Sequence, residues 1–101
     1  MSQNAPKPQQ PQQPVAIQIQ LDDDVAQGQY CNLAMINHNE TEFVLDFIYV
    51  QPQQPKAKVR SRVICSPRHA KQLLVALNEN VKLFEQKFGT IAIGAPPEVL
   101  H

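Results

Sequence analysis

Four stretches of the chain show arrangements of apolar and polar residues that are typical of β-strands. These stretches are residues 15–21, 30–37, 42–50 and 57–65. A period of two places successive side chains on opposite faces of a strand, so the pattern predicts four β-strands. Turn-forming residues, namely Gly28, residues 38–40 and the proline-containing segment 51–56, separate them. We expect the last three strands to form consecutive hairpins and therefore an antiparallel sheet.

The period changes after Cys65, where apolar residues recur at alternating spacings of four and three. They form one apolar stripe, which consists of Ala70, Leu74, Leu77, Val81, Phe84 and Phe88. Ser66 suits a helix N-cap, Pro67 the first helical position and Gly89 the C-cap. The sequence therefore predicts a helix over residues 67–88, ~33 Å long at the usual rise per residue.

The predicted helix is apolar over more than one narrow stripe. Leu73, Ala76 and Leu83 lie beside the apolar stripe and widen the apolar arc to roughly half of the helix circumference. One small sheet covers a narrower surface, and a folded part of roughly 75 residues is near the size at which partners are needed. We therefore expect a homodimer. The predicted interface residues are Leu73, Val81, Leu83, Phe84 and Phe88.

These elements together predict an α+β fold, with a four-stranded antiparallel sheet followed by one long C-terminal helix. Residues 1–14 contain four prolines and no large apolar residue beyond Met1. This composition predicts a disordered Pro/Gln-rich arm. A single domain is expected over residues 15–93 and a flexible tail over residues 94–101. The pattern leaves open whether the residues from 90 onward add an edge strand.

Asp46 interrupts the apolar run of residues 42–50 and decides the expected register. A slip of one residue exchanges the two faces of a strand, and pairing Asp46 with Arg60 keeps the apolar sets together. The same logic directs three residues of the 30–37 strand towards the helix, namely Cys31, Leu33 and Met35. Asp46 is then expected on the outer face of the sheet beside Asn32 and Arg60.

A semi-polar cluster is thus predicted on the outer face. Its members are Tyr30, Asn32, Asp46, Lys58, Arg60 and Arg62. Two interpretations are open. The charges and amides cross-link three strands as a structural feature, or they form a recognition surface for a peptide or a nucleic-acid strand.

Composition limits the chemistry that this domain can carry. The formal net charge is +0, which argues against a generic polyanion binder, although residues 1–50 are net acidic and residues 51–101 net basic. Cys31 and Cys65 lack metal-ligand spacing, and no phosphate-binding glycine loop or nucleophile elbow is present. We therefore expect no metal, no cofactor and no catalysis. Neither a membrane span nor a signal peptide is apparent, so a cytoplasmic protein is expected.

Several short motifs resemble one family. They are "YCN" at residues 30–32, "EFVLDF" at 42–47, "SPRHAK" at 66–71 and "FG" at 88–89. In combination they are similar to a family of short bacterial proteins catalogued only as a domain of unknown function. The resemblance implies a bacterial cytoplasmic protein without an assigned activity. It supplies no catalytic or ligand-binding residues.

The expected function is that of a non-enzymatic, homodimeric interaction module, whose partners are a second copy and an unidentified protein. The alternative is a single-stranded nucleic acid binder. The strand order resembles that of whirly-type nucleic acid binders, and the residues expected to contact the strand are Tyr30, Lys58, Arg60 and Arg62.

Overall fold

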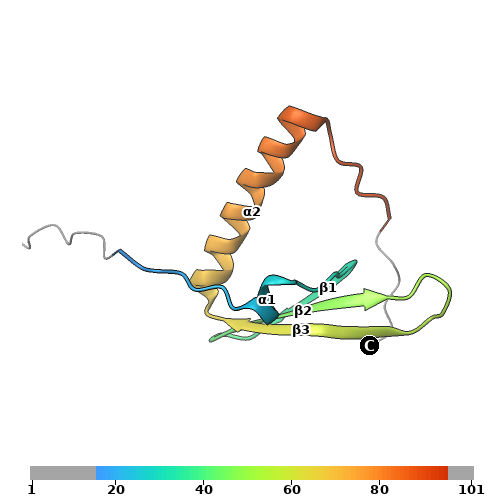
Figure 1. The fold of residues 1–101 in the computed structure, drawn as a ribbon, viewed down its shortest axis with the longest axis horizontal. Helices are drawn as coiled ribbons and strands as arrows, with labels where there is room; N and C mark the ends of the chain where they lie inside the picture. Colours follow the sequence, from blue (N-terminus) through green and yellow to red (C-terminus); the bar gives the residue numbers. More distant parts are fainter. Residues whose placement is uncertain (1–15, 96–101) are drawn as a thin grey trace, which may run out of the picture.

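A computed structural model describes residues 16–95 of the chain. The predicted arm, residues 1–14, and the tail from residue 96 onward lie outside the described residues. The elements are α1 (Asp23–Ala26), β1 (Leu33–His38), β2 (Phe43–Val50), β3 (Ala57–Cys65) and α2 (Pro67–Phe88). Figure 1 shows the sheet with the long helix α2 rising from its end. The predicted α+β class, with an antiparallel sheet and a C-terminal helix, is confirmed.

The described sheet has three strands in the order β1-β2-β3, so the prediction of four was wrong. Residues 16–21 form no strand, and Ile17, Ile19 and Leu21 remain exposed. The acidic run after them explains the difference. The carbonyl oxygen of Asp22 accepts hydrogen bonds from the amides of Val25 and Ala26, which closes the short helix α1. The chain then reaches β1 from α1 instead of through a hairpin.

The register of β2 with β3 differs from the predicted one by two residues over residues 43–47 and by one residue over residues 48–50. Asp46 lies opposite Arg62, and not opposite Arg60 as expected. The pairing is interrupted between Phe47 and Ile48, where Arg60 is the extra residue of a bulge in β3. A shift of two residues leaves Arg62 on the same face of the sheet as Asp46. The bulge, in contrast, turns Lys58 to the other face, where it lies opposite Tyr49.

The prediction for the faces of β1 was wrong. Met35 pairs with Asp46 and Leu33 with Ile48, so both share the face of the carboxylate. Apolar residues occupy both faces of β1, so alternation alone does not choose between the registers. The turn sets it instead, because the side-chain oxygen of Asn39 accepts hydrogen bonds from the amides of Thr41 and Glu42.

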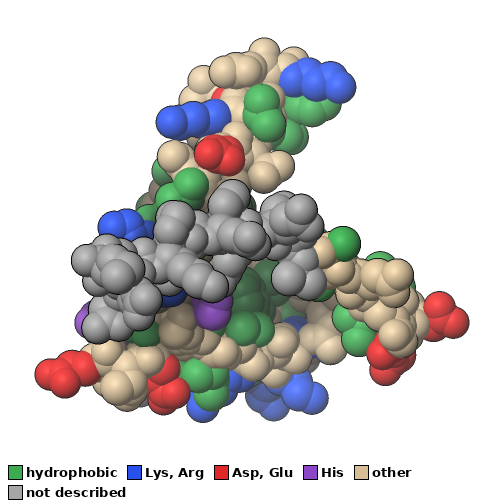
Figure 2. All heavy atoms as spheres, turned by 90° about the vertical axis from the view of Figure 1, so that its left-hand side faces the viewer, with side chains coloured by type: hydrophobic (Ala, Val, Ile, Leu, Met, Phe, Trp, Pro, Cys, Tyr) green, Lys and Arg blue, Asp and Glu red, His purple; other side chains and the backbone are tan. Residues whose placement is uncertain are grey.

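The helix α2 has the predicted ends. The hydroxyl of Ser66 accepts a hydrogen bond from the amide of His69, Pro67 occupies the first turn, and Gly89 follows the helix with a φ of 100°. No residue of α2 is buried. Figure 1 shows why, since α2 points away from the sheet and does not lie along it, and Figure 2 shows hydrophobic side chains at its surface.

The core of the described part of the chain is very small. Leu45 and Ile48 are its buried apolar residues, and Asp46 between them is also buried. All three belong to the central strand β2. The apolar residues of α2 therefore remain outside the core of the single chain.

Candidate functional site

The structure divides the predicted outer-face cluster between the two faces of the sheet. Asp46 and Arg62 lie opposite each other on one face. Lys58 lies opposite Tyr49 on the other face, and the guanidinium of Arg60 lies 5.4 Å from the centre of the Tyr49 ring. Tyr30 also contacts Tyr49. Asn32 belongs to neither face, because its side chain forms hydrogen bonds with the backbone of Val50 at the end of β2.

Asp46 and Arg62 form a two-point ion pair. The Arg62 Nε donates to Asp46 Oδ1 at 2.7 Å and its Nη2 donates to Oδ2 at 2.9 Å. This geometry holds the pKa of the Asp46 carboxyl below its ordinary value of 3.8 and raises the pKa of Arg62. The side chains are 10% and 62% exposed respectively, so the carboxylate is covered while the guanidinium is largely in water. The pair is a link between β2 and β3.

The side chain of Asn32 extends the ladder beyond β1. Its amide nitrogen donates to the Val50 carbonyl at 3.0 Å, and its side-chain oxygen accepts from the Val50 amide at 2.8 Å. The backbone amide of Asn32 donates to the Ile48 carbonyl. The carboxamide therefore takes the place of a backbone peptide group opposite Val50.

Replacing Asn32 by alanine should lower the free energy of unfolding by about 1–2 kcal/mol, because two hydrogen bonds to the backbone of Val50 are lost. Urea denaturation measures this change. Asn37→Ala, at an exposed position on the adjoining strand β1, is the control. An equal effect of the two alanine substitutions would contradict the ladder role of Asn32.

Tyr30, Tyr49, Lys58 and Arg60 form what we call the aromatic–basic cluster. The Tyr30 and Tyr49 rings meet edge to face with centroids 6.2 Å apart, and Tyr30 is 75% exposed. Arg60 lies over Tyr49. Tyr49 was not part of the predicted cluster, because Lys58 and Arg60 were expected on the opposite face. A bulge leaves no signal in alternation, so the sequence offered no means of finding this residue.

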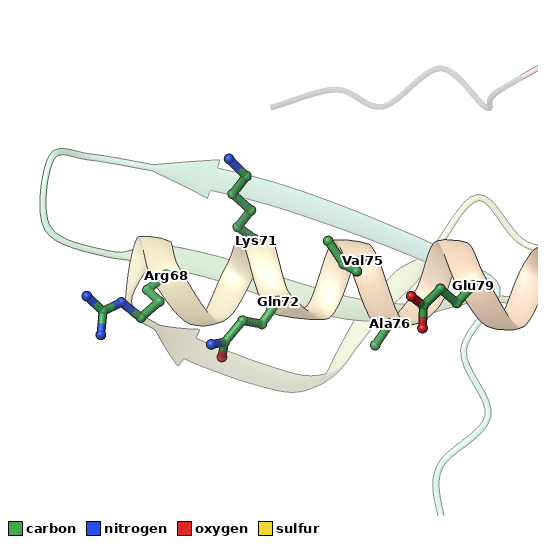
Figure 3. A pocket seen from close by; sticks show the side chains of 6 residues that line it. All are labelled: Arg68, Lys71, Gln72, Val75, Ala76 and Glu79. Carbon is green, nitrogen blue, oxygen red and sulfur yellow. The ribbon is translucent and has the colours of Figure 1, made fainter. Parts of the chain in front are cut away.

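Among the shallow hollows in the described part of the chain, two border the helices α1 and α2. One, of about 650 Å³, lies between α1 and the sheet beside Arg60, and Asp24 and Phe47 are among its lining residues. The other, of about 450 Å³, follows one side of α2 (Figure 3). Its lining residues are Arg68, Lys71, Gln72, Val75, Ala76 and Glu79. Because one helix supplies the whole lining, this hollow encloses a ligand from one side only.

The predicted dimer residues remain accessible on α2. Leu73, Leu83, Phe84 and Phe88 are exposed, and Val81 is half-buried. The rings of Phe84 and Phe88 lie 4.9 Å apart. They end the apolar stripe, whose Leu74 and Leu77 are exposed as well. The structure thus contains an uncovered apolar surface on α2 at the positions that the sequence indicated.

The described residues offer few groups for chemistry. Within residues 16–95, no three His, Cys, Asp or Glu side chains come together in a way that would hold a metal ion. No helix in that range has the length and apolar character needed to cross a membrane. Cys31 and Cys65 are free thiols.

Comparison with known proteins gives one match. The model of a family described as "Protein of unknown function (DUF3467)" matches residues 1–93. This match confirms the resemblance to a domain of unknown function that the short motifs indicated. Neither a curated protein nor a solved structure matches the chain.

Proposed function

Because the chain belongs to the DUF3467 family of unknown function, we propose a function from its own surfaces: a non-enzymatic, homodimeric interaction module. One observation carries this proposal. The 22-residue helix α2 has no buried residue, although its apolar stripe is suited to packing. Isolated helices are marginal in water and depend on tertiary packing of their apolar face. A partner surface is therefore needed to stabilise α2.

A second copy is the partner that fits best. The spacing of four and three along the apolar stripe is the one by which helices pack on each other, so identical stripes are complementary. The formal net charge of +0 means that two copies do not repel each other overall. Identical chains most often pair with two-fold symmetry. The apolar arc, which includes Leu73 and Leu83, is wide enough to contact a partner helix and a sheet.

Sedimentation equilibrium tests the proposal directly. We expect twice the chain mass of 11.4 kDa across micromolar concentrations, because the uncovered surface of α2 is apolar. A well-folded monomer at ~100 μM would contradict the homodimer, since dimers with an interface of ordinary size are formed well below that concentration. The surface of α2 would then belong to a different partner protein.

The remaining parts of the proposal rest on the polar groups. Within residues 16–95, a shift of the pKa is resolved for Asp46 and Arg62, and these two groups are engaged with each other. Neither of them is placed as an acid or base for a substrate, which supports a non-enzymatic role. Two free cysteines suit a reducing compartment, and we infer a cytoplasmic location from them.

A second candidate function is the binding of single-stranded nucleic acid by the aromatic–basic cluster. The observation in its favour is the contact of Tyr30 and Arg60 with one ring, Tyr49, on a single face. Exposed rings stack on bases, and cations beside them pair with phosphates. Arg62, which the sequence assigned to the same surface, lies on the other face.

Fluorescence anisotropy with a labelled oligonucleotide tests this candidate. We expect micromolar binding at ~50 mM salt that weakens strongly at ~200 mM salt, because phosphate contacts release counterions. Arg60→Ala should weaken it further. Arg68→Ala removes the same charge from α2 and serves as the control. Equal losses in both variants, or no binding at low salt, would remove this candidate.

A further inference from the structure

Residues 16–21, called the N-terminal segment here, have the sequence of a β-strand but pair with no strand in the described part of the chain. Ile17, Ile19 and Leu21 are 80%, 91% and 66% exposed, and glutamines alternate with them. Leaving such side chains in water forgoes roughly 25 cal/mol for each Å² of apolar surface. The segment is therefore suited to one face of a sheet, and its own chain does not cover it within the described residues.

The outer edge of β3 offers the place for such a strand. The order β1-β2-β3 leaves β3 at the edge of the sheet, and it is nine residues long. Every residue from Ala57 to Ile64 is exposed, and Val59, Val63 and Ile64 supply apolar neighbours. An exposed edge of this length presents unpaired amides and carbonyls to any compatible strand.

The charged residues favour this edge and an antiparallel direction of pairing. Asp22, Asp23 and Asp24 follow the N-terminal segment directly, whereas Lys56 and Lys58 stand at the beginning of β3. Antiparallel pairing brings these acidic and basic ends together. Parallel pairing would separate them by the length of the strand. The other edge strand, β1, has six residues and neither lysine nor arginine.

The position of α1 explains why the edge of a different copy is required. Asp24 and Val25 of α1 line a hollow together with Phe47 and Ser61, so α1 lies against a face of its own sheet. From α1 the N-terminal segment runs past the base of α2 and away from the sheet (Figure 1). It leads away from its own sheet and not back along its own β3.

We propose that the N-terminal segment of each copy adds to the outer edge of β3 in a second copy, as an antiparallel fourth strand. The inference rests on the proposed homodimer and specifies how that dimer is built. Reciprocal exchange of one strand closes with two-fold symmetry. Each sheet then contains β1, β2, β3 and one strand from the partner copy. The donated strand covers the apolar side chains of β3 together with its own.

A charge exchange tests the proposal. In the variant D22K/D23K, the residues after the N-terminal segment and those at the beginning of β3 are both basic. In the variant K56E/K58E, both sets are acidic. Each alone should dimerise at least ~10-fold more weakly than the unmodified chain, because like charges face each other. A heterodimer of the two variants restores both opposite-charge contacts. In an equimolar mixture, native mass spectrometry should show heterodimers well above the random share of about one half.

The control is K71E/K82E, which makes the same charge change on α2 and away from β3. Mixed with D22K/D23K, it should give no preference for the heterodimer. The strand exchange is overturned if both swapped variants dimerise as well as the unmodified chain and mix at random, while the homodimer itself stands. It is also overturned if one chain that carries all four substitutions recovers but the mixture does not, since the contact is then within one chain. An unmodified chain that sediments as a monomer overturns the homodimer first.

Discussion

Replacing Phe84 by glutamate should weaken the homodimer ~30-fold or more, the effect of losing an aromatic residue that an interface buries. Phe84 lies in the apolar stripe and its ring contacts that of Phe88. A carboxylate at this position would be removed from water on dimerisation without a partner. Sedimentation equilibrium should show the mass falling towards 11.4 kDa. Because the helix is uncovered in one chain, far-UV circular dichroism should show a parallel loss of helix.

Gln86→Glu is the matched control for this substitution. It introduces the same residue two positions along α2, outside the apolar stripe, and it should leave both mass and helicity unchanged. Should Phe84→Glu remain dimeric with full helicity, the apolar stripe does not form the interface. Should it become a monomer that keeps its helix, α2 does not depend on the partner for its folding.

The sequence predicted those elements whose signals are local. Ser66, Pro67 and Gly89 specify the ends of α2 by capping, and the structure has the helix between them. The apolar run of β2 and the alternation in β3 likewise predicted strands at nearly the observed positions. The strand expected at 15–21 failed in a single chain for a physical reason. Alternation describes which face a segment can cover, and it does not show whether the chain leads that segment to an edge of its own sheet.

The prediction of the candidate site was wrong where one extra residue in β3 changes the register of β3 with β2. The bulge at Arg60 places Arg60 beside Tyr49 and leaves Arg62 with Asp46, which divides the predicted cluster between two faces. An extra residue of this kind costs little and is set by local backbone geometry, so composition and period carry no trace of it. The face of β1 was decided by the side chain of Asn39 in the turn, which a pattern of apolar residues does not record.

The two members of the ion pair differ in their exposure to water. In the structure the carboxylate is the covered group, at 10% exposure, and the Arg62 side chain is 62% exposed. A charge left without a partner costs more where it is covered. Removing Arg62 is therefore the more damaging change.

Arg62→Ala should lower the melting temperature by several degrees at neutral pH, and Asp46→Ala should lower it by less. In the unmodified protein the Asp46 pKa is below 3.8, so its contribution to stability is present above that pH and is lost as the pH falls through the lowered pKa. Without Arg62, the remaining effect on the carboxyl is its removal from water, which raises its pKa. The folded variant then takes up a proton more readily than the unfolded chain.

The stability gap between Arg62→Ala and the unmodified protein should therefore close as the pH is lowered from about 7 to about 3. Thermal melts followed by circular dichroism across this range measure it. Arg68→Ala removes an equal charge from α2 and should show no such closing gap, because Arg62, and not Arg68, donates the hydrogen bonds to Asp46. A larger loss in Asp46→Ala than in Arg62→Ala, at neutral pH, would show that the guanidinium and not the carboxylate depends on the pair.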